Sequence, residues 1–121
     1  MEKNLKNKNI LIAEDDDFNY IVLSEMLYDT KANCYRARDG VEAVEKVEKE
    51  KYDLILMDIN MPRLDGMSAI KKIREKNNNI PIIVLTAYAY NEKLRREKGF
   101  NEFLVKPFEF DVVLNLVFKY L

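Results

Sequence analysis

Five side chains that could do chemistry each follow a short apolar run in this sequence. They are the acids Glu14, Asp15 and Asp58, the hydroxyl of Thr86 and the amine of Lys106. Carboxylates that lie close together repel one another, and a hard divalent cation such as Mg²⁺, which prefers oxygen ligands, relieves that repulsion. An amine and a hydroxyl beside them suit the oxygens of a phosphoryl group. If these side chains meet, their types indicate Mg²⁺-dependent phosphoryl transfer to Asp58.

The stretch LILMDINMPRLDG places Asp58 at the end of a predicted strand. Residues 54–57 are apolar without a break, and Pro62 and the pair Asp65–Gly66 interrupt any regular structure that follows. Short apolar runs bounded by turn residues are typical of strands buried on both faces of a parallel sheet. Ligand chemistry in such sheets collects just beyond the carboxyl ends of the strands. Asp58 could also simply cap a turn. The residues at the other strand ends distinguish these two interpretations.

Apolar runs alternate with amphipathic segments along the whole chain. Strands are predicted at residues 10–13, 32–37, 53–57, 80–85 and 102–105. Helices are predicted at residues 18–28, 41–49, 66–76, 88–98 and 109–121. This order predicts a three-layer α/β domain around a five-stranded parallel sheet. Apart from the more polar run at 32–37, which we expect at an edge, every predicted strand is followed directly by one of the five reactive residues.

Helix signals are clear at the first and the last of these helices. Asp16 or Asp17 is the expected N-terminal cap. Apolar residues recur at helical spacings, at Phe18, Ile21, Val22, Met26 and Tyr28. In the last helix we expect a core stripe of Phe110, Val113, Leu114 and Val117.

Composition excludes several classes of protein. The chain has 121 residues, enough for one domain, and a net charge of −1, which gives no field that favours nucleic acid or an anionic membrane. It has no histidine, which excludes Ser-His hydrolase triads and His-bound zinc, and its three glycines form neither a GxGxxG motif nor a P-loop. We expect a cytoplasmic domain with a polar lead at residues 1–8, no membrane span, and Cys34 as a small core residue.

Four motifs, in this order, resemble the receiver domains of two-component response regulators. They are ILIAEDD, LILMDINMPRLDG, the pair Thr86–Ala87, and FLVKPF at residues 103–108. The resemblance covers essentially residues 1–121 as a single receiver domain, and it implies the flavodoxin-like strand order 2-1-3-4-5. It also implies a signalling switch rather than an enzyme, with a histidine kinase or phosphotransfer protein as phosphodonor. The motifs are closest in style to receivers of hybrid sensor kinases, so a free-standing regulator and a fragment both remain open.

The resemblance also implies a role for each motif residue. Asp58 is the phosphoacceptor. The implied Mg²⁺ ligands are Asp15, Asp58, the backbone carbonyl of Asn60 and, through water, Glu14. Lys106 pairs with Asp58 and then with a phosphoryl oxygen, while the Thr86 hydroxyl bonds another. The bond between Lys106 and Pro107 is expected to be cis.

Three positions are candidates for a conformational switch. Phosphorylation adds about two negative charges, which would draw the Thr86 hydroxyl inward and vacate room for Phe103. Phe103 in a strand can equally be a core residue. A bulky Tyr88 is expected to hinder the attacking water and slow self-dephosphorylation, although it can equally be an exposed loop tyrosine.

The last predicted helix is apolar on every side, which on a surface usually indicates a partner. We therefore expect either a homodimer or an output partner there, or a chain cut from a longer protein. An alternative function is a haloacid-dehalogenase-like Mg²⁺-dependent phosphatase. Those enzymes carry a second aspartate two residues after the nucleophile, where this chain has Asn60. A flavin-binding flavodoxin would need a Ser/Thr/Gly-rich phosphate loop after the first strand, and this chain has none.

Overall fold

The computed structural model describes residues 4–76, 79–87 and 99–121. Its strands are β1 (Asn9–Ala13), β2 (Asn33–Ala37), β3 (Leu54–Asp58), β4 (Ile82–Thr86) and β5 (Glu102–Val105). Its helices are α1 (Asp17–Leu27), α2 (Gly40–Lys49), α3 (Gly66–Glu75) and α5 (Phe110–Tyr120), with a short 3₁₀ turn η1 (Tyr28–Thr30) after α1. The helix predicted at residues 88–98 lies outside the described residues.

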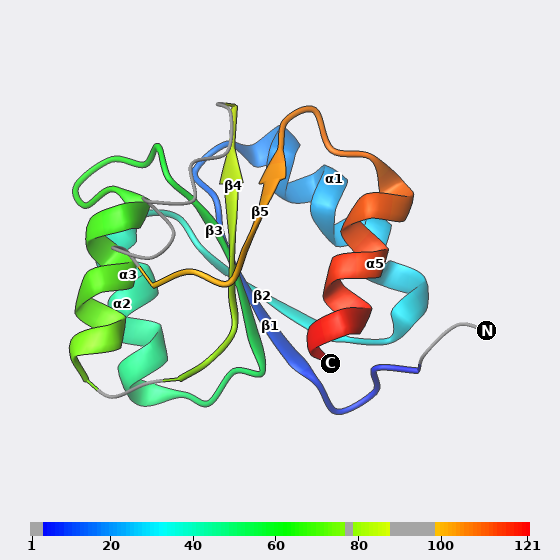
Figure 1. Cartoon of the computed structure of the whole chain (residues 1–121), viewed down its shortest axis with the longest axis horizontal. Coiled ribbons are helices and arrows are strands. Elements are labelled where there is room, and N and C mark those ends of the chain that lie inside the picture. Colours follow the sequence, from blue (N-terminus) through cyan, green and yellow to red (C-terminus); the bar gives the residue numbers. More distant parts are fainter. Residues whose placement is uncertain (1–3, 77–78, 88–98) are drawn as a thin grey trace.

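The five strands form one parallel sheet in the order β2-β1-β3-β4-β5. This confirms the predicted fold class and strand order, and it confirms that β2 is an edge strand. Because all strands run the same way, their carboxyl ends meet at one edge of the sheet, at the arrowheads in Figure 1. The register pairs Asp58 with Leu85 and Thr86 with Val105, so the tips of β3, β4 and β5 are neighbours.

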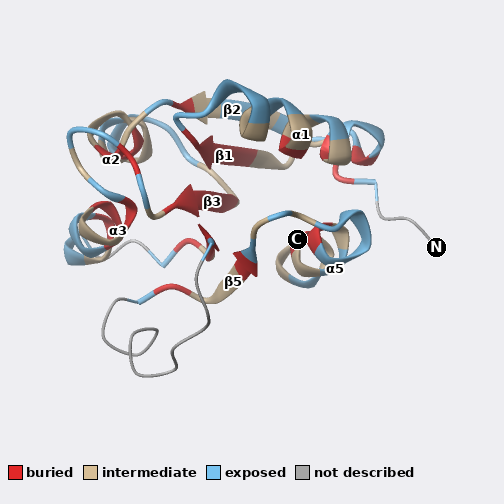
Figure 2. Ribbon diagram, turned by 90° about the horizontal axis from the view of Figure 1, so that it is seen from above, coloured by how far each residue is buried: buried red, intermediate tan, exposed pale blue. Residues whose placement is uncertain are grey.

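Helices cover both faces of the sheet, as Figures 1 and 2 show. Helices α2 and α3 lie on one face and α1 and α5 on the other. Strand residues alternate between the two cores, with Leu11 and Ile55 on the α2–α3 side and Ile12 and Leu56 on the α1–α5 side. Strands β3 and β4 are buried along their whole length, as an unbroken apolar run in a parallel sheet predicts.

Three helices begin at an aspartate whose carboxylate accepts a hydrogen bond from a backbone N–H of the first turn. Asp16 caps α1 through Asn19, at 3.1 Å. Asp39 and Asp65 cap α2 and α3 in the same way. Such caps satisfy N–H groups that have no partner inside the helix. The cap of α1 is therefore Asp16, the first of the two predicted candidates.

The buried face of α1 differs from the apolar pattern in the sequence. Phe18, Ile21 and Tyr28 are exposed by 72%, 54% and 73%, whereas Leu23 and Leu27 are fully buried. The helix carries apolar side chains around much of its circumference, so spacing alone does not select one face. The two leucines lie one turn apart and contact the sheet together.

Two chain segments also differ from the prediction. Strand β4 begins at Ile82 rather than at residue 80, because Pro81 has no N–H to donate to the ladder. The carbonyl of Pro81 still accepts a hydrogen bond from the Ile55 N–H at 3.0 Å. Within the polar lead, Leu5 is 2% exposed and its N–H donates to the Thr30 carbonyl at 2.7 Å. This part of the lead therefore belongs to the folded core.

Helix α5 packs most of its apolar surface against the protein itself. Val113 and Val117 are fully buried, but Phe110 is 50% exposed, so its predicted place in the core stripe is wrong. The partly buried residues that pack against the same core are Leu114, Leu116, Phe118, Tyr120 and Leu121. Part of the apolar character that suggested a partner is therefore explained by contacts within the domain, while Phe110 and Val112 stay exposed. Among the described residues, none of the helices is long and apolar enough to span a bilayer.

Candidate phosphoryl-transfer site

The reactive side chains predicted from the sequence all lie at the carboxyl edge of the sheet. Asp58 is the last residue of β3, Thr86 is the last residue of β4, and Lys106 directly follows β5. Glu14 and Asp15 directly follow β1, and the Glu14 N–H donates to the Ala37 carbonyl of β2 at 3.0 Å. The strand order thus brings together residues that are far apart in the sequence.

Three carboxylates form a cluster at this edge. One oxygen each from Glu14, Asp15 and Asp58 lies within 4.8 Å of the others. Glu14 and Asp58 are buried, with 0% and 2% exposure, while Asp15 is exposed. Two carboxylates are thus held away from water, and the third lies at the mouth of the site.

Lys106 provides the positive charge of the site. Its Nζ lies 3.2 Å from Asp58 Oδ2, within hydrogen-bond distance, and 3.7 Å from Glu14 Oε2. Its backbone N–H donates to the Thr86 carbonyl at 2.8 Å. The Lys106–Pro107 peptide bond is cis, as the resemblance implies.

Glu14 is only partly satisfied by hydrogen bonds. Its Oε1 accepts hydrogen bonds from the Asp16 N–H at 3.4 Å and from Asn19 Nδ2 at 3.3 Å. Its buried Oε2 has no hydrogen-bond donor among the described residues. Burial first, and then the neighbouring Asp58 carboxyl, raise the pKa of Glu14 to about 7, against the opposing effects of Lys106 and Asn19.

This donor set fits a divalent cation. Within the part of the chain that the structure describes, three carboxylates face the ammonium group of Lys106, and one buried oxygen has no hydrogen-bond donor. A cation such as Mg²⁺ takes oxygen ligands and neutralises crowded carboxylates. Asn19, which holds Glu14, was missed from the sequence because a lone asparagine in a first helical turn carries no specific signal.

The loop after Asp58 is held close to the strand tip. The Asn60 N–H donates to Asp58 Oδ1 at 3.1 Å, while the residue itself is exposed. A Cβ atom at Gly66 would lie 2.2 Å from the Asp58 carbonyl oxygen. Glycine is therefore required there by the close approach of the backbone.

The far side of the same loop is tied to the start of α2. Arg63 donates to both carboxylate oxygens of Asp39, at 2.8 and 3.0 Å. This pairing lowers the pKa of Asp39. A Cβ atom at Gly40 would lie 1.9 Å from the Leu64 carbonyl oxygen, so the loop rests directly on the first turn of α2.

The three predicted switch positions have different outcomes. Thr86 is buried at the tip of β4. Phe103 in β5 is half-buried and lies opposite Val84 of β4. Its side chain packs against the core on the α2–α3 side. Tyr88 lies outside the described residues, so its role stays a prediction.

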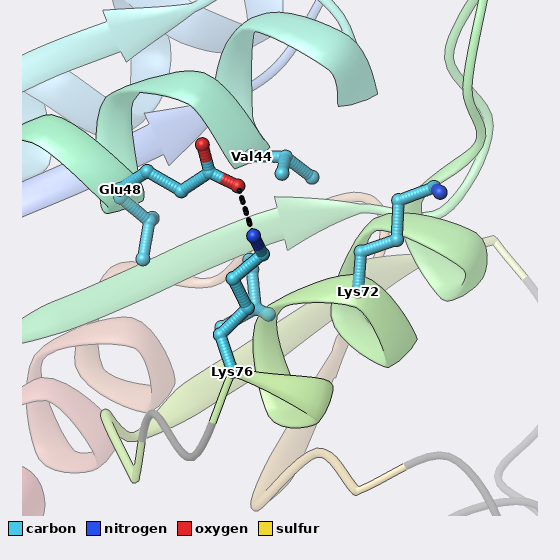
Figure 3. A pocket seen from close by; sticks show the side chains of 6 residues that line it. Val44, Glu48, Lys72 and Lys76 are labelled. Atoms are coloured by element: carbon cyan, nitrogen blue, oxygen red, sulfur yellow. Dashed lines mark ion pairs between the residues drawn. The ribbon is translucent and has the colours of Figure 1, made fainter.

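A pocket between α2 and α3 is separate from this chemistry. It has a volume of about 270 Å³ and contains none of the residues of the acidic cluster (Figure 3). Glu48 and Lys76 form an ion pair of 3.3 Å across its rim. The side chains that line it are Val44, Val47, Glu48, Lys72, Ile73 and Lys76.

Comparison with known protein families identifies the family of this chain. The model of the family described as "Response regulator receiver domain" matches residues 10–118. The chain belongs to this family. It is therefore a receiver domain of two-component phosphorelay signalling, and the phosphatase alternative has no support.

Known receivers are similar over nearly the whole chain. The Escherichia coli K12 sensor protein EvgS is 40% identical over 109 residues, which cover 87% of this chain and 9% of EvgS. The chain spans only 9% to 19% of the length of the first curated relatives it matches.

Solved receiver structures share the fold. The receiver domain of the Pseudomonas aeruginosa sensor histidine kinase PA1611, which has a magnesium ion coordinated in its active-site cleft, is 36% identical. Its TM-score is 0.84, and the match covers 93% of this chain and 96% of that one. The complex of the Saccharomyces cerevisiae phosphotransfer protein Ypd1 with the receiver domain of Ssk1 matches at 28% identity and a TM-score of 0.86. That match covers 93% of this chain and 88% of the other.

Proposed function

We propose that this receiver domain accepts a phosphoryl group on Asp58 in a reaction that requires Mg²⁺. The observation that carries the proposal is the convergence of three carboxylates within 4.8 Å of one another, with Lys106 Nζ 3.2 Å from Asp58. The buried Oε2 of Glu14, which has no hydrogen-bond donor among the described residues, supports a cation at this position. The proposed ligands are Asp15, Asp58, the backbone carbonyl of Asn60 and, through water, Glu14.

The proposed reaction is an in-line displacement at phosphorus. A carboxylate oxygen of Asp58 attacks the phosphorus of a phosphohistidine, the P–N bond breaks as the P–O bond forms, and the imidazole leaves with the electron pair. Lys106 moves from the Asp58 carboxylate toward a phosphoryl oxygen, and the Thr86 hydroxyl donates to another. A divalent cation held by these residues would supply neutralisation of the charge that develops on the transferred group. The protein itself contributes mainly positioning.

In this proposal the phosphoryl group stays on Asp58, and the phosphorylated domain acts as a signalling switch. The phosphoryl group adds about two negative charges beside Thr86. Displacement of the Thr86 hydroxyl changes the space beside Phe103, which lies on the neighbouring strand. We propose that Tyr88 slows hydrolysis of the acyl phosphate. A longer lifetime of the phosphoprotein in wild type than in Tyr88→Ala would support this.

The proposed phosphodonor is a histidine kinase or a phosphotransfer protein in the cytoplasm. Two similar receivers support this proposal. One is a domain of a sensor histidine kinase, and the other is bound to a phosphotransfer protein. A homodimer or an output partner through α5 also stays a proposal, supported by the exposure of Phe110 and Val112. Sedimentation of the phosphorylated and unphosphorylated protein tests the dimer.

The test of this function is intact mass spectrometry after incubation with acetyl phosphate. We expect one phosphate adduct when Mg²⁺ is present, and none with EDTA. Asp58→Asn should abolish the adduct, and Lys106→Ala and Asp15→Asn should strongly reduce it. Asp16→Asn is the matched control, because asparagine caps a helix as well as aspartate does.

Two results would contradict the proposal. An adduct that persists in Asp58→Asn would place the acceptor elsewhere. Equal labelling with Mg²⁺ and with EDTA would remove the metal from the reaction.

A further inference from the structure

Arg36 reaches from the edge strand β2 to the backbone of the acidic pair. Its Nε and Nη2 donate to the Glu14 carbonyl at 3.1 and 3.0 Å, and Nη2 also donates to the Asp15 carbonyl at 3.2 Å. The side chain is only 14% exposed. One guanidinium group thus holds two consecutive peptide units, which carry two of the four proposed metal ligands.

The remaining surface of the guanidinium is also engaged. Nη1 lies 2.8 Å from Asp17 Oδ1, in the first turn of α1. The central carbon of the guanidinium lies 4.7 Å from the centroid of the Tyr20 ring, within range of a cation–π contact. Arg36 is therefore held in one orientation by α1 while it binds the loop that precedes that helix.

We propose that Arg36 is a positioning residue for the metal site. It fixes the backbone of Glu14 and Asp15 so that their carboxylates converge on Asp58. This proposal rests on the proposed Mg²⁺-dependent function.

The loop needs such a tie because the carboxylates repel one another. In the metal-free protein, movement of the β1–α1 loop away from Asp58 would relieve this repulsion. The ladder between β1 and β2 ends at the hydrogen bond from the Glu14 N–H to the Ala37 carbonyl. Beyond that bond, the guanidinium group of Arg36 on β2 holds the carbonyl oxygens of both Glu14 and Asp15. Partners of this kind, one step removed from a metal, orient its ligands.

The sign of the effect separates positioning from simple electrostatics. Arg36 is a cation near a cation site, so its charge alone opposes Mg²⁺ binding. If only charge mattered, removal of Arg36 would tighten Mg²⁺ binding. Positioning predicts the opposite, a weaker affinity.

The experiment compares Arg36→Ala, Arg36→Lys and Arg38→Ala with wild type. Lysine keeps the charge but lacks the planar fork that bonds two carbonyls. Arg38 is the matched control, because it pairs with the same Asp17 oxygen at 3.2 Å and is 65% exposed. Among the described contacts, its side chain forms no hydrogen bond with Glu14 or Asp15. Titration calorimetry measures Mg²⁺ affinity, and amide hydrogen exchange in EDTA measures protection of residues 14–17.

We expect Mg²⁺ affinity to fall about tenfold in Arg36→Ala and nearly as much in Arg36→Lys. Both variants should lose amide protection at residues 14–17, and Arg38→Ala should match wild type in both measurements. If Arg36→Ala does not fold, Arg36→Lys alone decides.

Two results would overturn the inference. Wild-type affinity in Arg36→Lys would leave only a role for the charge, and tighter binding in Arg36→Ala would show that the charge dominates. Absence of Mg²⁺ binding in wild type would instead refute the proposed function itself, so the two failures are distinguishable.

Discussion

Replacement of Glu14 by glutamine should stabilise the metal-free domain at alkaline pH. Glu14 is fully buried, and its pKa is raised from the usual 4.5 to about 7. Between these values the folded state binds more protons than the unfolded state, so stability falls as the pH rises. The Glu14→Gln variant has no carboxyl to ionise. An amide nitrogen in place of Oε2 can also donate toward Asp58.

The size of the effect follows from the pKa values. A difference of one pKa unit corresponds to about 1.4 kcal/mol, so the rise from 4.5 to about 7 corresponds to about 3 kcal/mol above pH 7. Linkage then predicts that the stability advantage of Glu14→Gln over wild type widens by about 2 kcal/mol between about pH 5.5 and about pH 8. For a chain of this size that is a difference in Tm of roughly 6–10 °C.

The assay is urea denaturation in EDTA, followed by far-UV circular dichroism at several pH values. The control is Glu25→Gln, an exposed glutamate on α1, which should track wild type at every pH. Saturating Mg²⁺ should reduce the pH dependence of wild type, because the ion binds the ionised acid.

A constant difference in stability between Glu14→Gln and wild type across this pH range would refute the reasoning. It would mean that Glu14 ionises at the same pH in the folded and unfolded chains. A wild-type protein that becomes more stable relative to Glu14→Gln as the pH rises would reverse the assigned sign.

Three further predictions test the packing. Gly66→Ala should destabilise the fold by about 2 kcal/mol or more, measured by urea denaturation, because the added Cβ would overlap the Asp58 carbonyl oxygen; wild-type stability would contradict this. Leu5→Ala should cost about 2–4 kcal/mol in the same assay, whereas an equal, negligible loss in Leu5→Ala and Lys6→Ala would show a solvated lead. Burial raises the pKa of the Cys34 thiol to about 11, so alkylation near pH 8 should be slow until denaturant is added, and rapid labelling of the native protein would disprove it.

The reactive residues could be predicted from the sequence because each of them directly follows a predicted strand or another such residue. Asp58 follows an unbroken apolar run, and a parallel sheet brings such ends to one edge. The parallel sheet follows from the alternation of strands and helices, whereas the strand order and the role of each site residue were implied by the resemblance to receiver domains. The sequence also indicates Asp16 and Asp17 as the two candidate caps, because the preference for aspartate at that position is strong, and the structure selects Asp16.

Other features depend on packing that no local pattern reveals. Leu5 is an isolated apolar residue in a polar segment, yet it is buried beside the end of α1. Helix α1 carries apolar residues on several sides, so its buried pair, Leu23 and Leu27, could not be selected by spacing. The role of Arg36 was missed because its partners, the carbonyls of Glu14 and Asp15, are 22 and 21 positions away in the sequence. They become neighbours only when β1 and β2 pair.

The hydrogen bond from the Lys106 N–H to the Thr86 carbonyl, at 2.8 Å, links two groups that the proposed reaction uses. The amine and the hydroxyl start from adjacent strand tips that share this bond, so neither backbone can shift alone without breaking it. Any rearrangement on one tip is therefore transmitted to the other. A substitution that shifts the backbone of one tip will therefore also shift the other, whereas one that changes only a side-chain rotamer can adjust one group alone.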